Sequence, residues 1–87
     1  MTTITHKPER QAFIVSLALD KDKAEVKEAL LEYTLKDNDV IDFRRTYVPF
    51  ALRGKGLAEA LVQEGLAWAR EQGYSITASC SYVQKFL

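Results

Sequence analysis

The chain has 87 residues, of which 47% are hydrophobic and 28% charged, and its 12 Lys and Arg balance its 12 Asp and Glu. This length predicts one domain with a single core, since a chain of this size buries only about 60% of its unfolded surface. The balanced charge argues against a nucleic-acid-binding protein, which is typically basic. One cysteine and one histidine exclude an internal disulfide and a dedicated transition-metal site.

The first nine residues differ from the rest of the chain. Residues 1–9 are polar and show no hydrophobic period, so we expect a loose arm followed by a single domain over 10–87. They lack the basic and apolar regions of a signal peptide, and no apolar run is long enough to span a membrane. These features predict a cytoplasmic protein that does not bind membranes and whose lone thiol stays reduced.

Three segments of the first half favour or permit strands. Residues 11–19 are rich in β-branched and aromatic side chains and stop at the charged stretch 20–23. Residues 24–35 are ambiguous, since good helix formers coexist with an apolar alternation at the strand period. A turn signal then leads into another β-rich run at 40–48. A hairpin of about 28–35 with 40–48 is therefore the simpler interpretation.

The second half predicts a helix, a strand and a final helical turn. Apolar residues recur at helical spacing from Leu57 to Ala69. Gly73 stands where a left-handed cap ends a helix, residues 74–78 favour a strand, and a short helical segment follows. The predicted fold class is α+β in layers: a mixed, mainly antiparallel sheet of about four strands, a long helix after a glycine loop, and a short C-terminal helix.

A loop with two glycines lies between the strand at 40–48 and the long helix, and it reads Arg53-Gly54-Lys55-Gly56-Leu57-Ala58. Backbone N–H groups at a helix start have no partner within the helix and lie at the positive end of its dipole. The glycines let the main chain approach an anion, and the two basic residues add charge, so the loop favours a phosphate site. Glycines here also suit a plain tight turn, and the loop fits neither the Walker pattern nor the dinucleotide fingerprint.

The loop resembles that of the GCN5-related N-acetyltransferases. Arg53-x-x-Gly56-x-Ala58 matches the family signature Arg/Gln-x-x-Gly-x-Gly/Ala and stands, as in that family, between a strand and a helix. Over roughly residues 28–87 the chain is similar to the small single-domain YjdJ-type acetyltransferases. The segments that carry this similarity are Thr46-Tyr47-Val48-Pro49, Leu52 to Ala58, Ala67-Trp68-Ala69-Arg70 and Cys80-Ser81-Tyr82-Val83.

The resemblance implies acetyl-CoA as co-substrate, no metal, and an amine as acceptor. It implies that the strand ending at 46–48 diverges from the strand at 74–78, which leaves an opening for the pantetheine arm. Relatives often carry His before the Thr and Pro before the Ser-Cys, where this chain has Arg45 and Ala78. No role of that histidine is therefore carried over. The residues implied to bind the co-substrate are Thr46, Tyr47, Val48, Arg53, Gly54, Lys55, Gly56, Leu57 and Ala58.

Cys80 and Tyr82 are the candidate catalytic residues. Cys80 opens the final helical turn, where unpaired N–H groups favour the thiolate, so it is a candidate nucleophile. Tyr82 is a candidate acid that protonates the departing CoA thiolate, a role tyrosine often fills in the related enzymes. Each also has a purely structural interpretation, as a small packed thiol and as a ring on the sheet edge. His6, in the expected arm, is interpreted as solvated.

The predicted function is transfer of an acetyl group from acetyl-CoA to an amine of a small molecule or a protein. The amine attacks the thioester directly, or Cys80 is acetylated first. The alternatives are a non-catalytic acyl-CoA-binding module and an interaction domain that presents Tyr33 or Trp68 to a partner. The elements on the acceptor side are short, and the family's histidine is absent, which keeps the alternatives open. The sheet edges permit a monomer or a weak homodimer.

Overall fold

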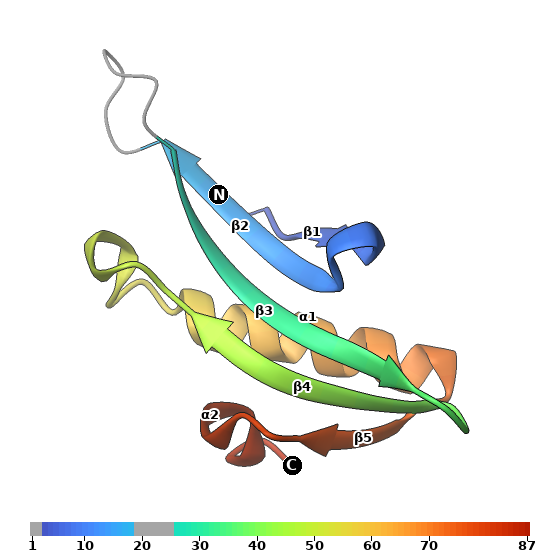
Figure 1. Ribbon diagram of the computed structural model, residues 1–87. Helices are drawn as coiled ribbons and strands as arrows, with labels where there is room; N and C mark the ends of the chain where they lie inside the picture. The colour runs from blue at the N-terminus through green and yellow to red at the C-terminus, as the bar shows by residue number, and fades with distance from the viewer. Residues whose placement is uncertain (1–2, 19–25) are drawn as a thin grey trace.

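The computed structural model describes residues 3–18 and 26–87 of the chain. The charged stretch 20–23, expected to end the first strand, lies outside the described residues, as do residues 24 and 25. The elements, drawn in Figure 1, are β1 (Thr5–Lys7), the 3₁₀ helix η1 (Pro8–Arg10), β2 (Ala12–Ala18), β3 (Val26–Lys36), β4 (Val40–Tyr47), the 3₁₀ helix η2 (Phe50–Leu52), α1 (Leu57–Gln72), β5 (Ser75–Ala78) and α2 (Ser81–Gln84).

The described strands form one sheet in the order β1-β2-β3-β4-β5. The first four strands are antiparallel, and β5 joins β4 in parallel after the crossover through α1. The mixed, mainly antiparallel sheet with one long and one short helix is thus confirmed. The ambiguous segment is a strand from residue 26 onward, because β3 pairs with β2 on one side and with β4 on the other. The expected hairpin is therefore β3 with β4.

The loose arm expected over residues 1–9 is wrong from Thr5 onward, where β1 adds a fifth strand to the sheet. The His6 ring stacks on the Phe13 ring, with 4.2 Å between ring centres. Nε2 of His6 lies 2.6 Å from the hydroxyl of Tyr33. His6 is therefore half buried, not solvated. Both partners lie outside residues 1–9, and Tyr33 is 27 residues away, so the local pattern of that segment carried no sign of them.

The helix α1 packs across one face of the sheet, because its buried residues recur at helical spacing. Gly65 lets the helix approach the sheet closely: a Cβ there would lie 2.6 Å from Cδ2 of Leu31 and 3.1 Å from Cε1 of Phe43. Tyr33 belongs to this core and is 1% exposed, which removes it from any partner surface. The core cluster comprises Phe13, Val15, Ala29, Leu31, Tyr33, Ile41, Phe43, Leu52, Leu57, Leu61, Val62, Leu66, Ala69 and Val83.

A β-bulge in β4 decides which face the end of that strand presents. The register between β3 and β4 shifts by one residue, which leaves Arg44 without a Cα partner. Side chains alternate between the two faces of a sheet, so an extra residue reverses the alternation beyond it. Thr46 is paired with Leu31 of the core and lies on the α1 side, whereas Tyr47 lies on the opposite face. The bulge thus turns Thr46 toward the start of α1.

Candidate functional site

The strands β4 and β5 separate at the end of the sheet near α2. Their parallel pairing ends with Phe43 opposite Ala78. One more main-chain hydrogen bond follows, donated by the N–H of Cys80 to the carbonyl oxygen of Phe43 at 3.1 Å. Beyond it β4 continues to Tyr47, while the other chain segment turns into α2 (Figure 1). An opening therefore forms between the end of β4, α2 and the start of α1.

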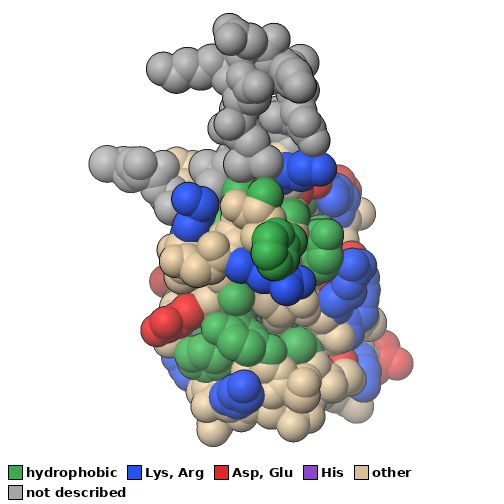
Figure 2. Space-filling model, turned by 90° about the vertical axis from the view of Figure 1, so that its left-hand side faces the viewer, with side chains coloured by type: hydrophobic (Ala, Val, Ile, Leu, Met, Phe, Trp, Pro, Cys, Tyr) green, Lys and Arg blue, Asp and Glu red, His purple; other side chains and the backbone are tan. Residues whose placement is uncertain are grey.

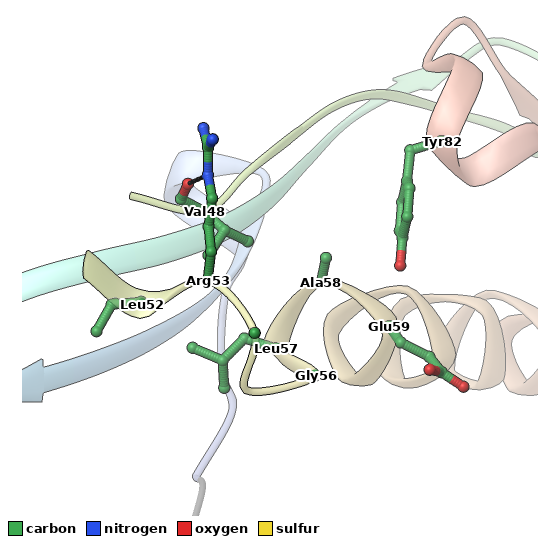
Figure 3. Close-up of a pocket in the computed structure, with 9 residues that line it drawn as sticks. Val48, Leu52, Arg53, Gly56, Leu57, Ala58, Glu59 and Tyr82 are labelled. Carbon is green, nitrogen blue, oxygen red and sulfur yellow. Dashed lines mark hydrogen bonds between the residues drawn. The ribbon is translucent and has the colours of Figure 1, made fainter. Parts of the chain in front are cut away.

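A cavity of about 180 Å³ occupies this opening. Figure 2 shows this end of the molecule, where two groups of hydrophobic side chains are separated by Lys and Arg side chains. The cavity walls come from the end of β4, from η2 and the loop after it, from the first turn of α1 and from α2. The lining residues, most of them labelled in Figure 3, are Val48, Leu52, Arg53, Gly54, Gly56, Leu57, Ala58, Glu59 and Tyr82.

The start of α1 offers backbone N–H donors to this cavity. The first main-chain hydrogen bond of the helix runs from the N–H of Ala60 to the carbonyl of Gly56 at 3.1 Å. No described side chain caps the helix, so the N–H groups of Leu57 and the next two residues have no partner within it. Gly54 and Gly56 have φ of +81° and +72°, the left-handed region that favours glycine. A Cβ at either glycine would meet no protein atom within 4 Å, so the space beside them is open.

The charged residues of the loop are placed differently from one another. Arg53 lines the cavity, and its Nε donates to the carbonyl oxygen of Val48 at 3.2 Å. Its guanidinium carbon lies 5.8 Å from the centre of the Phe50 ring. Lys55 is exposed and is not among the lining residues. Glu59 lines the cavity and was missed by the sequence reasoning, although an acid in the first turn of a helix is a recognisable signal.

Cys80 is half buried and, although it stands two residues before Tyr82, it is not among the residues that line the cavity. Its Sγ is 3.6 Å from Oγ1 of Thr46, the residue that the bulge turns toward α1. Burial by itself raises the pKa of the Cys80 thiol. Hydrogen bonds from the backbone of Val83, from Thr46 and from the backbone of Tyr82 outweigh burial and lower that pKa below its ordinary value. The thiol therefore has more thiolate character at neutral pH than an ordinary cysteine.

Tyr82 projects from α2 across the opening, with its hydroxyl directed toward the start of α1 (Figure 3). Its ring packs on Phe86 at 5.3 Å between centres, and Nζ of Lys85 lies 5.7 Å from the ring centre. Tyr47 instead lies on the other face of the sheet, 42% exposed, with the Arg45 guanidinium carbon 5.3 Å from its ring centre. The structure thus brings most of the expected loop together with Tyr82 but leaves the Tyr47 side chain outside the cavity.

We also searched residues 3–18 and 26–87 for metal ligands and for membrane-spanning helices. No group of three or more His, Cys, Asp or Glu side chains there could hold a metal ion. No helix in the same part of the chain is long and apolar enough to cross a membrane. What the cavity offers is a set of anion-binding donors at the start of α1 together with the phenol of Tyr82.

Known proteins resemble this chain over nearly its whole length. The sequence profile of the family described as GCN5-related N-acetyl-transferase matches residues 16–87. Protein NATD1 of Bos taurus is 33% identical over 84 residues, which cover 97% of this chain and 70% of that protein. Protein NATD1 of Mus musculus is 32% identical, with 97% and 72% covered. The solution structure of a GCN5-like putative N-acetyltransferase from Staphylococcus aureus aligns with a TM-score of 0.54 at 26% identity, covering 97% of this chain and 76% of that one.

Proposed function

We propose that this chain, which belongs to the GCN5-related N-acetyltransferase family, binds acetyl-CoA in the opening between β4 and β5 and transfers its acetyl group to an amine. The observation that carries the proposal is the cavity itself. Its lining combines the uncapped start of α1, two left-handed glycines and Tyr82. Cys80 and Thr46 are not among the lining residues; their side chains contact each other, with Sγ of Cys80 3.6 Å from Oγ1 of Thr46. Donors suited to a pyrophosphate and a phenol suited to protonating a thiolate thus line one cavity, which supports the proposal.

The proposed contacts with acetyl-CoA follow from the chemistry of the walls. The N–H groups at the start of α1 and the charge of Arg53 suit the pyrophosphate, because both adjoin an open, glycine-lined space. The end of β4, which has lost its partner strand, suits the amide groups of the pantetheine arm. The co-substrate-binding residues of the proposal are Thr46, Tyr47, Val48, Arg53, Gly54, Lys55, Gly56, Leu57 and Ala58, with Tyr47 contributing its main chain because its side chain faces away from the cavity.

Two routes for the transfer are open, one that uses Tyr82 and one that uses Cys80. In direct transfer the neutral amine attacks the thioester carbonyl, the N–C bond forms, the C–S bond breaks, and the departing thiolate takes a proton from Tyr82. The proton lost by the acetylated nitrogen then returns to the Tyr82 phenolate. In the two-step route the Cys80 thiolate attacks the thioester and CoA leaves as the thiolate, which takes a proton from solvent. The neutral amine then attacks the acetyl-cysteine, the Cys80 thiolate leaves, and the acetylated nitrogen gives its proton to solvent. The lowered pKa of Cys80 and its contact with Thr46 support the second route.

A non-catalytic acyl-CoA-binding module is the second candidate function. Arg45 stands where relatives often carry a histidine, and the segments available to shape an acceptor pocket are short. This module would bind acetyl-CoA through the same loop but would release no CoA thiol. For the enzyme we propose a cytoplasmic location, where a lone thiol stays reduced, and a monomeric or weakly dimeric state.

The test is a titration with CoA followed by an assay of thiol release from acetyl-CoA with a panel of amines. We expect binding and, with a suitable amine, turnover. Binding without turnover for any amine would support the module, and a lack of CoA binding would contradict both candidate functions. Calorimetry reports the first step, and colorimetric thiol detection reports the second.

The two routes differ in what they leave on the protein. Incubation with acetyl-CoA and no amine should add an acetyl group to Cys80 in the two-step route, which mass spectrometry detects, and Cys80→Ser should then remove nearly all turnover. Direct transfer predicts that Cys80→Ser stays active while Tyr82→Phe slows turnover by about 10²–10⁴-fold. If both variants keep the parental rate, neither residue is catalytic.

A further inference from the structure

A second cavity, of about 210 Å³, lies between the edge strand β1 and the helix α1. It has no residue in common with the cavity at the end of β4. The α1 residues that line it begin five residues beyond Glu59, about 7 Å along the helix at 1.5 Å per residue. The second cavity is therefore a separate site. Its lining residues are Ile4, His6, Phe13, Glu64, Ala67, Trp68 and Glu71.

Aromatic rings form one part of this cavity. The His6 ring lies nearly parallel to the Phe13 ring, at 7° and 4.2 Å between centres. Trp68 meets His6 edge-on at 4.5 Å. The Tyr33 hydroxyl, 2.6 Å from Nε2 of His6, fixes the orientation of the imidazole. Burial lowers the pKa of His6, against an opposing effect of Glu9, so the ring is neutral at pH 7 and adds no positive charge to the cavity.

Carboxylates form the other part. Glu64 and Glu71 are seven residues apart in α1, two helical turns, so both lie on the face of the helix that carries Trp68. Neither side chain makes an ion pair or hydrogen bond with any other residue that the structure describes. Apart from the neutral His6, no basic side chain lines the cavity. The cavity thus combines two exposed, unpaired carboxylates with the half-buried rings of Trp68 and His6.

We propose that this cavity binds an alkylammonium group. A cation is attracted to the carboxylates and to the half-buried ring of Trp68. Phe13 is 2% exposed and stacks on His6, so its ring face is not open to a ligand. The alkyl portion would lie against Ile4 and Ala67, the apolar aliphatic members of the lining. An anion is disfavoured by the carboxylates. The volume is below the roughly 300–1,000 Å³ of sites for drug-sized ligands, so the occupant is a group of side-chain size.

The alkylammonium group has two possible sources, a free amine and the lysine side chain of a protein. The chain has a single tryptophan, Trp68, so its intrinsic fluorescence reports directly on this cavity. We would titrate the full chain with butylammonium chloride and, separately, with a short peptide that contains one lysine, at constant ionic strength. The comparison ligands have the same four-carbon chain: sodium butyrate carries a negative charge, and 1-butanol is uncharged.

We expect saturable binding of butylammonium, with a dissociation constant on the order of millimolar for so small an ion. Butyrate and butanol should produce no saturable change. Tighter binding of the peptide than of butylammonium would identify a lysine side chain as the occupant, and the reverse would identify a free amine. A cavity that binds neither cation, or binds butanol equally well, overturns the proposal.

The matched variants separate local charge from net charge. Glu64→Gln with Glu71→Gln should weaken butylammonium binding at least about ten-fold, because both unpaired charges are removed. Asp37→Asn with Asp39→Asn removes the same charge from the exposed turn between β3 and β4 and should leave the affinity unchanged. Circular dichroism checks that both double variants remain folded. Equal affinities of the two double variants would overturn the role of the carboxylates.

Discussion

Replacing Gly56 by alanine should damage co-substrate binding more than it damages the fold. At φ +72° an alanine destabilises the folded state by about 1–2 kcal/mol. Alanine also makes the unfolded chain less flexible than glycine does, which offsets about 0.4–1 kcal/mol of this loss. The new Cβ would meet no protein atom within 4 Å, so no steric cost is added. We therefore expect the free energy of unfolding to fall by about 1 kcal/mol.

The same Cβ would occupy the space proposed for the pyrophosphate. A hydrogen bond to a charged group contributes about 1.5–3 kcal/mol, so losing the approach to one donor should weaken CoA binding by about 10–100-fold. Gly73→Ala is the matched control. Gly73 ends the same helix at φ +78°, and a Cβ added there would also meet no protein atom within 4 Å, but it lies far from the cavity. It should lose similar stability and keep parental CoA affinity.

Urea unfolding followed by Trp68 fluorescence measures the stability of both variants, and calorimetry measures their CoA affinity. The test compares the CoA affinities of the two variants, which should lose similar stability, so any effect of destabilisation on affinity is the same in both. If Gly56→Ala and Gly73→Ala bind CoA equally well, the start of α1 is not the pyrophosphate site and the proposed function loses its main support. If neither the parent nor Gly73→Ala binds CoA, the proposed function itself fails.

Three further predictions concern the core, the buried carboxylate and the thiol. Gly65→Ala should lower the free energy of unfolding by about 1–2 kcal/mol in urea melts, since its Cβ would lie 2.6 Å from the core; unchanged stability would contradict this close packing. Asp42 is 7% exposed, and hydrogen bonds from hydroxyl groups lower its pKa, first that from Ser79 at 2.6 Å, so the ionised carboxylate adds stability above its unfolded pKa that is lost as pH falls through the folded pKa. Asp42→Asn should therefore lower the free energy of unfolding by about 1–3 kcal/mol at pH 7 and by less in acid. A cost that does not change with pH would refute this. Thr46→Val should raise the pKa of Cys80 and slow its alkylation by iodoacetamide at pH 7, and an unchanged pH profile would show that Thr46 does not stabilise the thiolate.

Much of the candidate site could be predicted from the order of residues along the chain. Gly54 and Gly56 adopt the left-handed conformations for which glycine is suited, and the helix begins directly after them. Arg53, Gly54, Gly56 and the first helical residues all line one cavity. Tyr82 could be placed beside them only through the resemblance to a family, because it comes from α2, which follows the whole of α1 and β5 in the chain. Which lining residues bind CoA stays a prediction.

The sequence by itself determined the features that depend on neighbours in the chain: the turn between β3 and β4, the amphipathic helix with its glycine ends, and the glycine loop before it. Only the tertiary structure decided that residues 26–36 form a strand, that Thr5–Lys7 join the sheet, and that the bulge at Arg44 turns Thr46 toward Cys80. Periodicity and backbone preference act over a few residues. Strand pairing, register and the stacking of His6 on Phe13 arise between residues that meet only when the chain folds.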